Sequence, residues 1–264
     1  MDPINQYIEK TKQIVETVEN QKEQIKKAAS WFSDTILNGR MVHVFGSGHS
    51  RIMVEEMWPR YGSFPGFNPI VELSLSFHNL VVGANGQRQA MFLENVSGLA
   101  DRILRNFDLS KQDSAMVISS SGTSMVSVEM AEIFQQRGIK VVAIVTKSSV
   151  AVSTSKREDG KKLDDFANLV LDTGAPNGDA MVEISNLETP VSPGSTVGGA
   201  MLVNCLKAEV ARQLTEAGQP PKVLTSGSIV GRERSEKLFE SAYDEHAHRL
   251  AKLYENVGSE KNHL

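Results

Sequence analysis

Residues 41–57, MVHVFGSGHSRIMVEEM, join three kinds of sequence without a linker. The apolar run at 41–45 is typical of a strand that is covered on both faces. It stops at a turn of two glycines and two serines, residues 46–50, and a helix-compatible stretch with Glu55 and Glu56 follows. A buried strand, a small polar turn and a helix predict a parallel α/β fold, in which ligands bind beyond the carboxyl ends of the strands.

The same pattern recurs further along the chain. A short apolar strand at 116–118 leads into SSSGTS, residues 119–124, and then into a helix, while PGST at 193–196 opens another helix. Together with the opening run, the β-rich runs lie at 41–45, 115–119, 140–146 and 168–172, and helical patterns lie near 50–58, 87–107, 123–137 and 196–217. This alternation predicts βαβ units and a parallel sheet with flanking helices.

Long helices are predicted at both ends of the chain. Residues 4–37 form one amphipathic pattern, whose apolar stripe must cover either the domain or a partner subunit, so we expect a homo-oligomer, a dimer or a tetramer. A charged helix is expected from about 234 to 256. The predicted organisation is therefore an N-terminal helical extension at 1–38, a central domain at 39–218 and a C-terminal loop and helix at 219–264.

Composition limits the partners that the chain could have. A formal net charge of -4 over 264 residues argues against nucleic acid as a partner. The N-terminus is charged and has no signal-like apolar core, and no segment is long enough to span a bilayer, so we expect a cytoplasmic protein without a membrane partner. The single cysteine, Cys205, lies in an apolar run and is expected to be a buried structural thiol.

The three hydroxyl-rich turns predict an uncharged phosphate site. Each precedes a helix, whose N-terminus offers unpaired N–H groups and the positive end of a dipole. One such turn alone would be explained by helix capping, but three favour a shared site. The dinucleotide fingerprint fails at Arg51, and no nucleotide-binding P-loop pattern is present. The candidate binding residues are Gly46, Ser47, Gly48, His49, Ser50, Ser119, Ser120, Ser121, Gly122, Thr123, Ser124, Ser195 and Thr196.

The paired turns GSGHS at 46–50 and SSSGT at 119–123 resemble the signature of the sugar isomerase (SIS) domain. The resemblance covers roughly residues 35–215 and is strongest to bacterial SIS-domain proteins labelled as phosphoheptose isomerases. It implies a flavodoxin-like three-layer α/β sandwich that binds phosphosugars. The segment EMWPRYG at 56–62 and the GST at 194–196 are also similar to N-acetylmuramic acid 6-phosphate etherases.

Isomerisation of a sugar phosphate requires a base beside the phosphate site and donors that stabilise an enediolate. Glu55 and Glu56 lie about 100° apart on a helix, so one of them is expected to face the site, and the etherase resemblance selects Glu56. The same resemblance makes Glu94 a second candidate. His78 is a candidate acid for ring opening, and Arg88 a candidate contact for the anionic substrate.

Three functions remain open from the sequence alone. They are a sugar-phosphate aldose–ketose isomerase, an etherase-like lyase and a non-catalytic phosphosugar sensor that controls a protein partner. No cofactor and no metal are expected, because His246 and His248 lack metal-ligand spacing. The aromatic segment 58–69 is expected to form a wall or lid over the sugar or to pack between subunits, and 178–184 to add a strand at the edge of the core.

Overall fold

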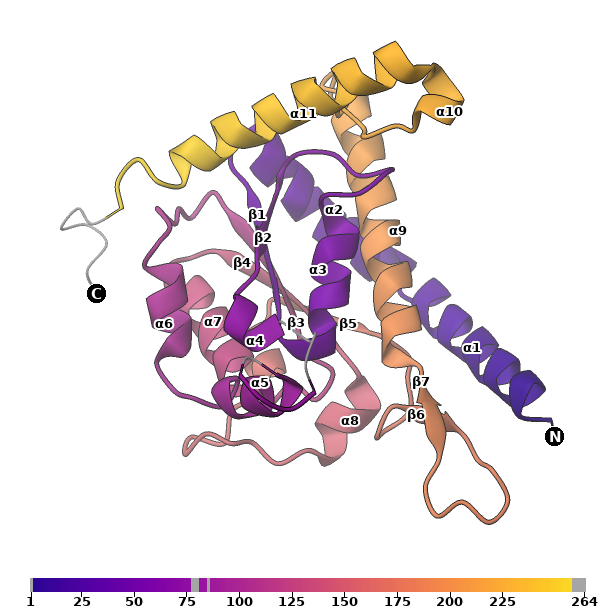
Figure 1. The fold of residues 1–264 in the computed structure, drawn as a ribbon. Helices are drawn as coiled ribbons and strands as arrows, with labels where there is room; N and C mark the ends of the chain where they lie inside the picture. The colour runs from indigo at the N-terminus through magenta and orange to yellow at the C-terminus, as the bar shows by residue number, and fades with distance from the viewer. Residues whose placement is uncertain (1, 77–80, 85, 258–264) are drawn as a thin grey trace.

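A computed structural model describes residues 2–76, 81–84 and 86–257. At its centre is a five-stranded parallel sheet in the order β2-β1-β3-β4-β5 (Figure 1). The strands are β1 Val42–Gly46, β2 Phe67–Ile70, β3 Ser114–Ile118, β4 Lys140–Val145 and β5 Leu169–Asp172. The chain winds outward in both directions from the pair β1 and β3, which makes this pair the switch point of a doubly wound fold. The predicted flavodoxin-like α/β fold is confirmed.

Helices cover both faces of the sheet, so the core has two halves. One face carries α2 (Lys22–Leu37), α3 (Arg51–Met57) and α9 (Ser195–Glu216), and the other carries α6 (Leu99–Leu104), α7 (Met125–Gln136) and the 3-10 helix η2 (Leu163–Phe166). Along β1, Val42 and Val44 belong to the first half and Phe45 to the second. Because both faces are buried, every residue of the strand is buried, and its sequence does not alternate between apolar and exposed polar residues.

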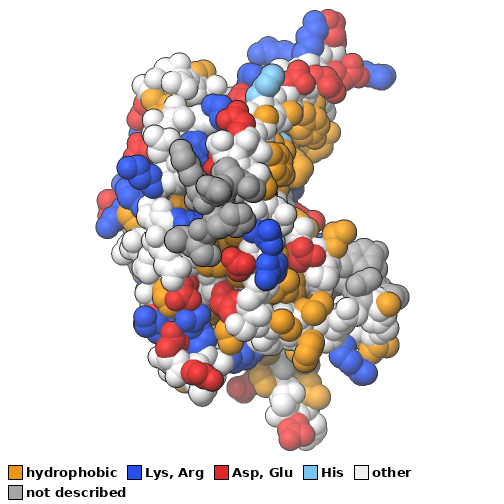
Figure 2. Space-filling view, turned by 90° about the vertical axis from the view of Figure 1, so that its left-hand side faces the viewer, with side chains coloured by type: hydrophobic (Ala, Val, Ile, Leu, Met, Phe, Trp, Pro, Cys, Tyr) orange, Lys and Arg blue, Asp and Glu red, His pale blue; other side chains and the backbone are white. Residues whose placement is uncertain are grey.

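The remaining elements surround this sandwich. They are α1 Pro3–Glu19, the 3-10 helix η1 Gly48–Ser50, α4 Leu73–Ser76, α5 Gln87–Leu93, α8 Lys147–Val152, β6 Ala180–Val182, β7 Val191–Pro193, α10 Gly227–Val230 and α11 Arg232–Lys252. In Figure 1, α11 crosses the upper edge of the sheet, and α4, α5 and the start of α9 lie at the lower edge. Figure 2 shows α11 as a charged arm with apolar side chains along its inner side.

The prediction of one long helix at 4–37 is wrong, because this segment forms two helices, α1 and α2. Asn20 caps the end of α1, and Gln21 lies outside both helices. The side-chain amide of Gln21 donates to the carbonyl of Asp172 (2.9 Å) and accepts from its N–H (2.7 Å). It thereby completes the hydrogen bonding of β5 at the sheet edge, which an uninterrupted helix would not allow.

Two strand assignments also need correction. The edge strand β2 lies outside the β-rich runs identified in the sequence, and it directly precedes α4. The segment 178–184 does not join the edge of the core: β6 pairs with β7 in a separate antiparallel ribbon. Of the residues described, no helix has both the length and the apolar character needed to cross a membrane.

The aromatic segment 58–69 does not line the cavity described below. The rings of Trp58, Phe64 and Phe67 are buried in the core half that contains α9, and Tyr61 packs edge-on against Phe239 of α11. Cys205, expected to be buried, is exposed on α9. The neighbouring Leu202, Val203 and Leu206 face the core, whereas Cys205 lies on the side of the helix that faces solvent. The apolar composition of the run does not show which of its residues face solvent.

A buried ionic network ties together the amino-terminal ends of three strands. Asp113, just before β3, is 3% exposed and accepts from Arg40 Nε (2.7 Å) and Arg40 Nη2 (2.9 Å). Its Oδ2 lies 3.2 Å from Nε2 of the buried His43, whose Nδ1 lies 3.0 Å from the Asn68 side-chain nitrogen on β2. Burial alone raises the pKa of Asp113, but the hydrogen bonds from His43 and Arg40 outweigh it and lower the pKa below its ordinary value.

Replacing Asp113→Asn is expected to destabilise the protein by about 3–5 kcal/mol, because Arg40 would lose its buried counter-charge. The lowered pKa adds stability above the unfolded-state value of about 4, and this stability is lost as the pH falls through the folded-state value. Urea unfolding at pH 7 and at pH 3 should therefore show a smaller difference between wild type and variant at pH 3. Asp101→Asn, at an exposed position, is the control, and an equal loss from it would contradict the network's role.

Candidate functional site

The three hydroxyl-rich turns converge on one cavity of about 460 Å³, beyond the carboxyl ends of β1 and β3. Strands β1 and β3 are parallel neighbours in which Gly46 pairs with Ile118, so the turns that follow them emerge side by side. The start of α9 adds the third wall. The hydroxyl side chains that line the cavity belong to Ser47, Ser50, Ser119, Ser120, Ser121, Ser124, Ser195 and Thr196.

The turn after β1 is shaped by a close approach of main chain to main chain. A Cβ at Gly46 would lie 2.7 Å from the carbonyl oxygen of Ser50, so this position excludes any larger residue. Gly48 has a positive φ of 58° and begins η1. The hydroxyl of Ser47 is oriented by a 2.8 Å hydrogen bond to Glu94 Oε2. Gly46 thus shapes the turn from outside the lining, whereas Ser47, Gly48, His49 and Ser50 line the cavity.

The turn after β3 leads into α7, a helix of 12 residues. Ser121 Oγ accepts from the N–H (3.3 Å) and the hydroxyl (3.1 Å) of Thr123, and it still faces the cavity. Gly122 has a φ of 66°, and a Cβ there would meet Val150 at 3.0 Å. Gly122 and Thr123 therefore support the turn from behind instead of lining the cavity.

Glu94 brings a carboxylate into the same cavity. It is the C-cap of α5, and its carbonyl accepts from the N–H of Val126 (3.0 Å) and from the hydroxyl of Ser124 (3.2 Å). These bonds fix the end of α5 to the start of α7. Glu94 is part-buried rather than a solvated surface residue, and Ser47 holds its side chain.

Glu56, the carboxylate selected from the sequence, lies outside this cavity. Its Oε1 accepts from the side-chain amide of Asn204 (2.8 Å) on α9, and its Oε2 pairs with Arg60. Burial raises the pKa of Glu56, but the hydrogen bonds from Asn204 and Arg60 together lower it below its ordinary value. The expectation that its side chain reaches the turns is therefore not met within a single chain, since α3 directs it toward α9.

Of the other predicted residues, Arg88 does not join the site. Arg88 is exposed at the start of α5 and does not line the cavity, because this surface of the helix faces solvent. His78 lies outside the described residues. His246 of α11 packs against Trp58 at 5.3 Å between ring centroids, away from the hydroxyl turns, and burial lowers its pKa.

The sequence interpretation missed Asp179. Its Oδ1 accepts from the N–H groups of Gly194 (3.0 Å) and Ser195 (2.6 Å), and its Oδ2 accepts from the Ser195 hydroxyl (2.8 Å). Asp179 also lines the cavity. No local sequence signal identifies Asp179, because the whole β6–β7 ribbon separates it from α9 in the chain. Its positive φ of 68° is seen only in the structure.

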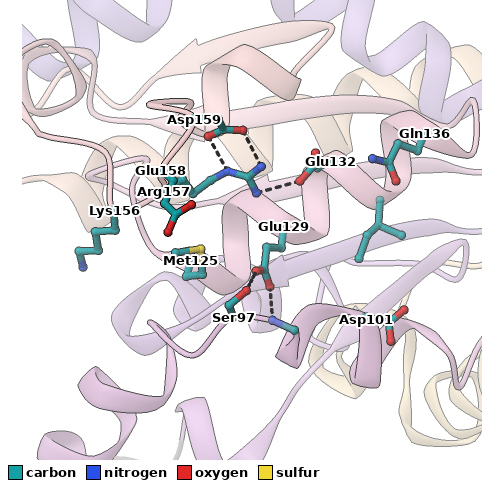
Figure 3. Close-up of a pocket in the computed structure, with 12 residues that line it drawn as sticks. Ser97, Asp101, Met125, Glu129, Glu132, Gln136, Lys156, Arg157, Glu158 and Asp159 are labelled. Atoms are coloured by element: carbon teal, nitrogen blue, oxygen red, sulfur yellow. Dashed lines mark hydrogen bonds and ion pairs between the residues drawn. The ribbon is translucent and has the colours of Figure 1, made fainter.

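A larger cavity of about 680 Å³ lies elsewhere, between the start of α6, α7 and the 156–159 loop (Figure 3). Several of its charged groups already have partners: Arg157 pairs with Glu132 (2.8 Å) and with Asp159 (2.8 Å), and Glu129 accepts a hydrogen bond from Ser97. The hydrogen bond from Arg157 lowers the pKa of Asp159 to about 2. This cavity receives none of the three turns, so the smaller one is the candidate site.

Comparisons with known proteins agree with this architecture. The sequence profile of the SIS domain family matches residues 6–146. The UPF0309 protein BH3325 of Halalkalibacterium halodurans is 33% identical over 225 residues, which cover 85% of this chain and 90% of that protein. The UPF0309 protein GK1441 of Geobacillus kaustophilus is 31% identical over 243 residues, covering 92% and 94%. The structure of a phosphoheptose isomerase from Francisella tularensis is 18% identical, covers 80% of this chain and 97% of that one, and superposes with a TM-score of 0.52, which supports the fold alone.

The position of α9 can be tested at Gly198. A Cβ there would lie 1.8 Å from the carbonyl oxygen of Thr173, a main-chain atom that cannot move aside, so Gly198→Ala should cost at least about 3 kcal/mol in urea unfolding. Gly199→Ala is the matched control, because its Cβ would meet only the flexible Met53 side chain at 3.0 Å, and about 1 kcal/mol is expected. Equal losses from both would show that α9 does not depend on this contact.

Proposed function

We propose that this chain, which belongs to the SIS domain family, binds a phosphosugar in the cavity formed by the three turns and isomerises it between aldose and ketose. The proposal rests on one observation above all: the carboxylate of Glu94, which accepts a hydrogen bond from Ser47, lies in the same cavity as the hydroxyl cradle. A solved structure with this fold is a phosphoheptose isomerase, which agrees with a phosphosugar substrate.

The phosphate would bind at the start of α7. The hydroxyls of Ser119, Ser120 and Ser121 face the cavity there, and the N-terminus of α7 contributes the positive end of its dipole. Serine hydroxyls both donate and accept, so they can adjust to each phosphate oxygen. Ser50, from the turn after β1, also lines the cavity and would complete the cradle.

Glu94 is the proposed base in place of Glu56. In the open-chain sugar, its carboxylate would remove the proton from the carbon beside the carbonyl, and the electron pair of the broken C–H bond forms an enediolate. Return of that proton to the neighbouring carbon, with transfer of a hydroxyl proton between the two oxygens, yields the isomer, so no oxidant or co-reactant is consumed. Ser47, which donates to Glu94 Oε2, would keep the carboxylate oriented.

Glu94→Gln should lower the turnover number by about a hundred- to ten-thousand-fold, because the amide cannot accept the proton. Phosphosugar binding should change little, since the cradle supplies the phosphate contacts. Glu56→Gln is the matched control: it removes an equivalent carboxylate outside the cavity, so its effect on turnover should be much smaller. The measurement is turnover of a panel of aldose phosphates, with binding followed by thermal shift, in which a ligand at a hundred times its Kd adds about 2.7 kcal/mol.

Several outcomes would separate the proposed isomerase from the other functions. A larger loss from Glu56→Gln than from Glu94→Gln would return the catalytic role to Glu56 and favour etherase-like chemistry. Tight binding without turnover of any phosphosugar would favour a sensor. Absence of binding across the panel would contradict the phosphosugar site itself.

We also propose that the chain forms a homo-oligomer through α1. Ile4 is 70% exposed and Ile8 is 46% exposed, and a groove between α1, α2 and α9 continues the apolar surface. Light scattering at micromolar concentration should give at least a dimer, and the double substitution Ile4→Ser and Ile8→Ser should shift it toward the monomer. Ile229→Ser, on the exposed side of α10, is the control, and an unshifted mass in the double variant would place the interface elsewhere.

A further inference from the structure

The proposed reaction starts from an open-chain sugar, whereas the longer aldose phosphates exist in solution mainly as rings. The ring must open before Glu94 can reach the carbon beside the carbonyl. Opening requires a group that accepts a proton from one oxygen and donates a proton to another, which is general acid–base catalysis. Serine hydroxyls are not among the side chains that usually perform it, so the hydroxyl cradle does not supply this group.

The cavity contains one imidazole among its described lining residues, that of His49. His49 is the middle residue of η1, in the turn that follows β1, and it is exposed toward the open space of the site. An imidazole can both accept and donate a proton near neutral pH, so histidine is the side chain used most often for general acid–base catalysis. The lining therefore includes the kind of group that ring opening requires.

The turn after β1 brings His49 and Glu94 to the same part of the cavity. Ser47 donates a 2.8 Å hydrogen bond to Glu94 Oε2, and His49 follows Ser47 by two residues. The N–H of Ser50 donates to the carbonyl of Ser47 at 3.1 Å and closes the turn around His49. Two residues of chain span at most about 7 Å. One small ligand in a cavity of about 460 Å³ can therefore contact both side chains.

The other titratable groups of the described lining are already engaged. The carboxylate of Asp179 accepts from the N–H of Gly194 and from the N–H and hydroxyl of Ser195, so it serves as the cap of α9. Glu94 must be ionised to remove the C–H proton, and an ionised carboxylate has no proton to give to a ring oxygen. Lys, Tyr and Cys do not occur among the described lining residues. His49 is thus the remaining group that can exchange protons with the sugar oxygens.

We propose that His49 is the acid–base group that opens the sugar ring before Glu94 acts, an inference that rests on the proposed isomerase function. The imidazole accepts the proton of the anomeric hydroxyl, whose oxygen forms the carbonyl as the bond from the anomeric carbon to the ring oxygen breaks. The electron pair of that bond goes to the ring oxygen, which takes the proton from the imidazole. His49 is regenerated, and no co-reactant is consumed. The substrate class is then an aldose phosphate bound in its ring form.

Ring opening can be measured separately from isomerisation. In Glu94→Gln the C–H proton cannot be removed, so an opened sugar can only close again, and closing interconverts its two anomers. NMR magnetisation exchange between the anomeric signals measures this rate for three ligands: glucose 6-phosphate, mannose 6-phosphate and ribose 5-phosphate. For a ligand that it binds, Glu94→Gln should interconvert the anomers at least about tenfold faster than occurs without protein.

A second substitution tests the histidine itself. Adding His49→Gln to Glu94→Gln should return anomer exchange to the protein-free rate, while calorimetry still detects binding, because the phosphate contacts remain. His248→Gln, added to Glu94→Gln, is the matched control: His248 is an exposed histidine of α11 outside the cavity lining, so exchange should stay as fast as in Glu94→Gln. In the otherwise wild-type chain, His49→Gln should lower isomerase turnover at least about tenfold.

The inference is overturned if Glu94→Gln binds a ligand but leaves its anomer exchange at the protein-free rate, a result that does not depend on the folding of any His49 variant. It is equally overturned if the double variant with His49→Gln exchanges the anomers as fast as Glu94→Gln. In both cases the proposed isomerase function would stand. That function fails by different results: none of the three ligands binds the wild type, or Glu94→Gln keeps the wild-type turnover.

Discussion

The contact between α9 and the end of β5 sets the geometry on which the candidate site depends. At Gly198 the helix lies so close to the carbonyl of Thr173 that no side chain fits between them. This contact fixes the height of α9 above the sheet, and thus the position of Ser195 at the cavity wall. The turns after β1 and β3 are placed by the sheet itself, but the third wall depends on this approach of two backbones.

Among its described lining residues, the cavity has hydroxyl groups but neither Lys nor Arg. Anion sites built from Lys and Arg attract from a distance, and their attraction weakens with salt. A cradle of hydroxyls and helix N–H groups acts only at contact, so shape and hydrogen-bond direction decide what binds. The carboxylates of Glu94 and Asp179, which line the same cavity, are each oriented by hydrogen bonds, so a ligand would meet groups that do not need to reorganise.

The sequence predicted the parts of the fold that depend on local pattern. Strands β1, β3, β4 and β5 are mostly apolar, because helices cover both faces of the sheet. Strand β2 was missed because Pro69 and Asn68 lie in it; a proline is tolerated there only because β2 is at the edge of the sheet. The break between α1 and α2 was missed because its cause is a hydrogen bond from Gln21 to the distant Asp172.

The residues of the candidate site also fall into two groups: those that a local sequence pattern predicts and those that depend on contacts between distant parts of the chain. Ten of the predicted binding residues line the cavity, because the glycine and hydroxyl turns are local signals for strand–helix junctions. Whether Glu56 or Glu94 lines the cavity depends on which side of α3 faces the turns. The sequence of a short helix does not reveal this, because it does not show which elements pack against the helix. Asp179 was invisible for a different reason: its partners at Gly194 and Ser195 are 15 and 16 residues away, across a ribbon that no motif predicts.

Helix α1 is hydrogen-bonded to the β6–β7 ribbon, so cleavage within this helix would affect a distant part of the chain. The Gln6 side chain accepts from the Glu183 N–H at 2.6 Å, and the Tyr7 hydroxyl donates to the Pro193 carbonyl at 2.9 Å, so the outer turns of α1 brace the β6–β7 ribbon. That ribbon lies between Asp179 and Ser195 in the chain. Proteolytic nicking within α1, or a bulky fusion at its start, would thus loosen the wall of a cavity whose other residues lie far along the sequence. The amino-terminal helix therefore supports the wall of the cavity through its contacts with the ribbon.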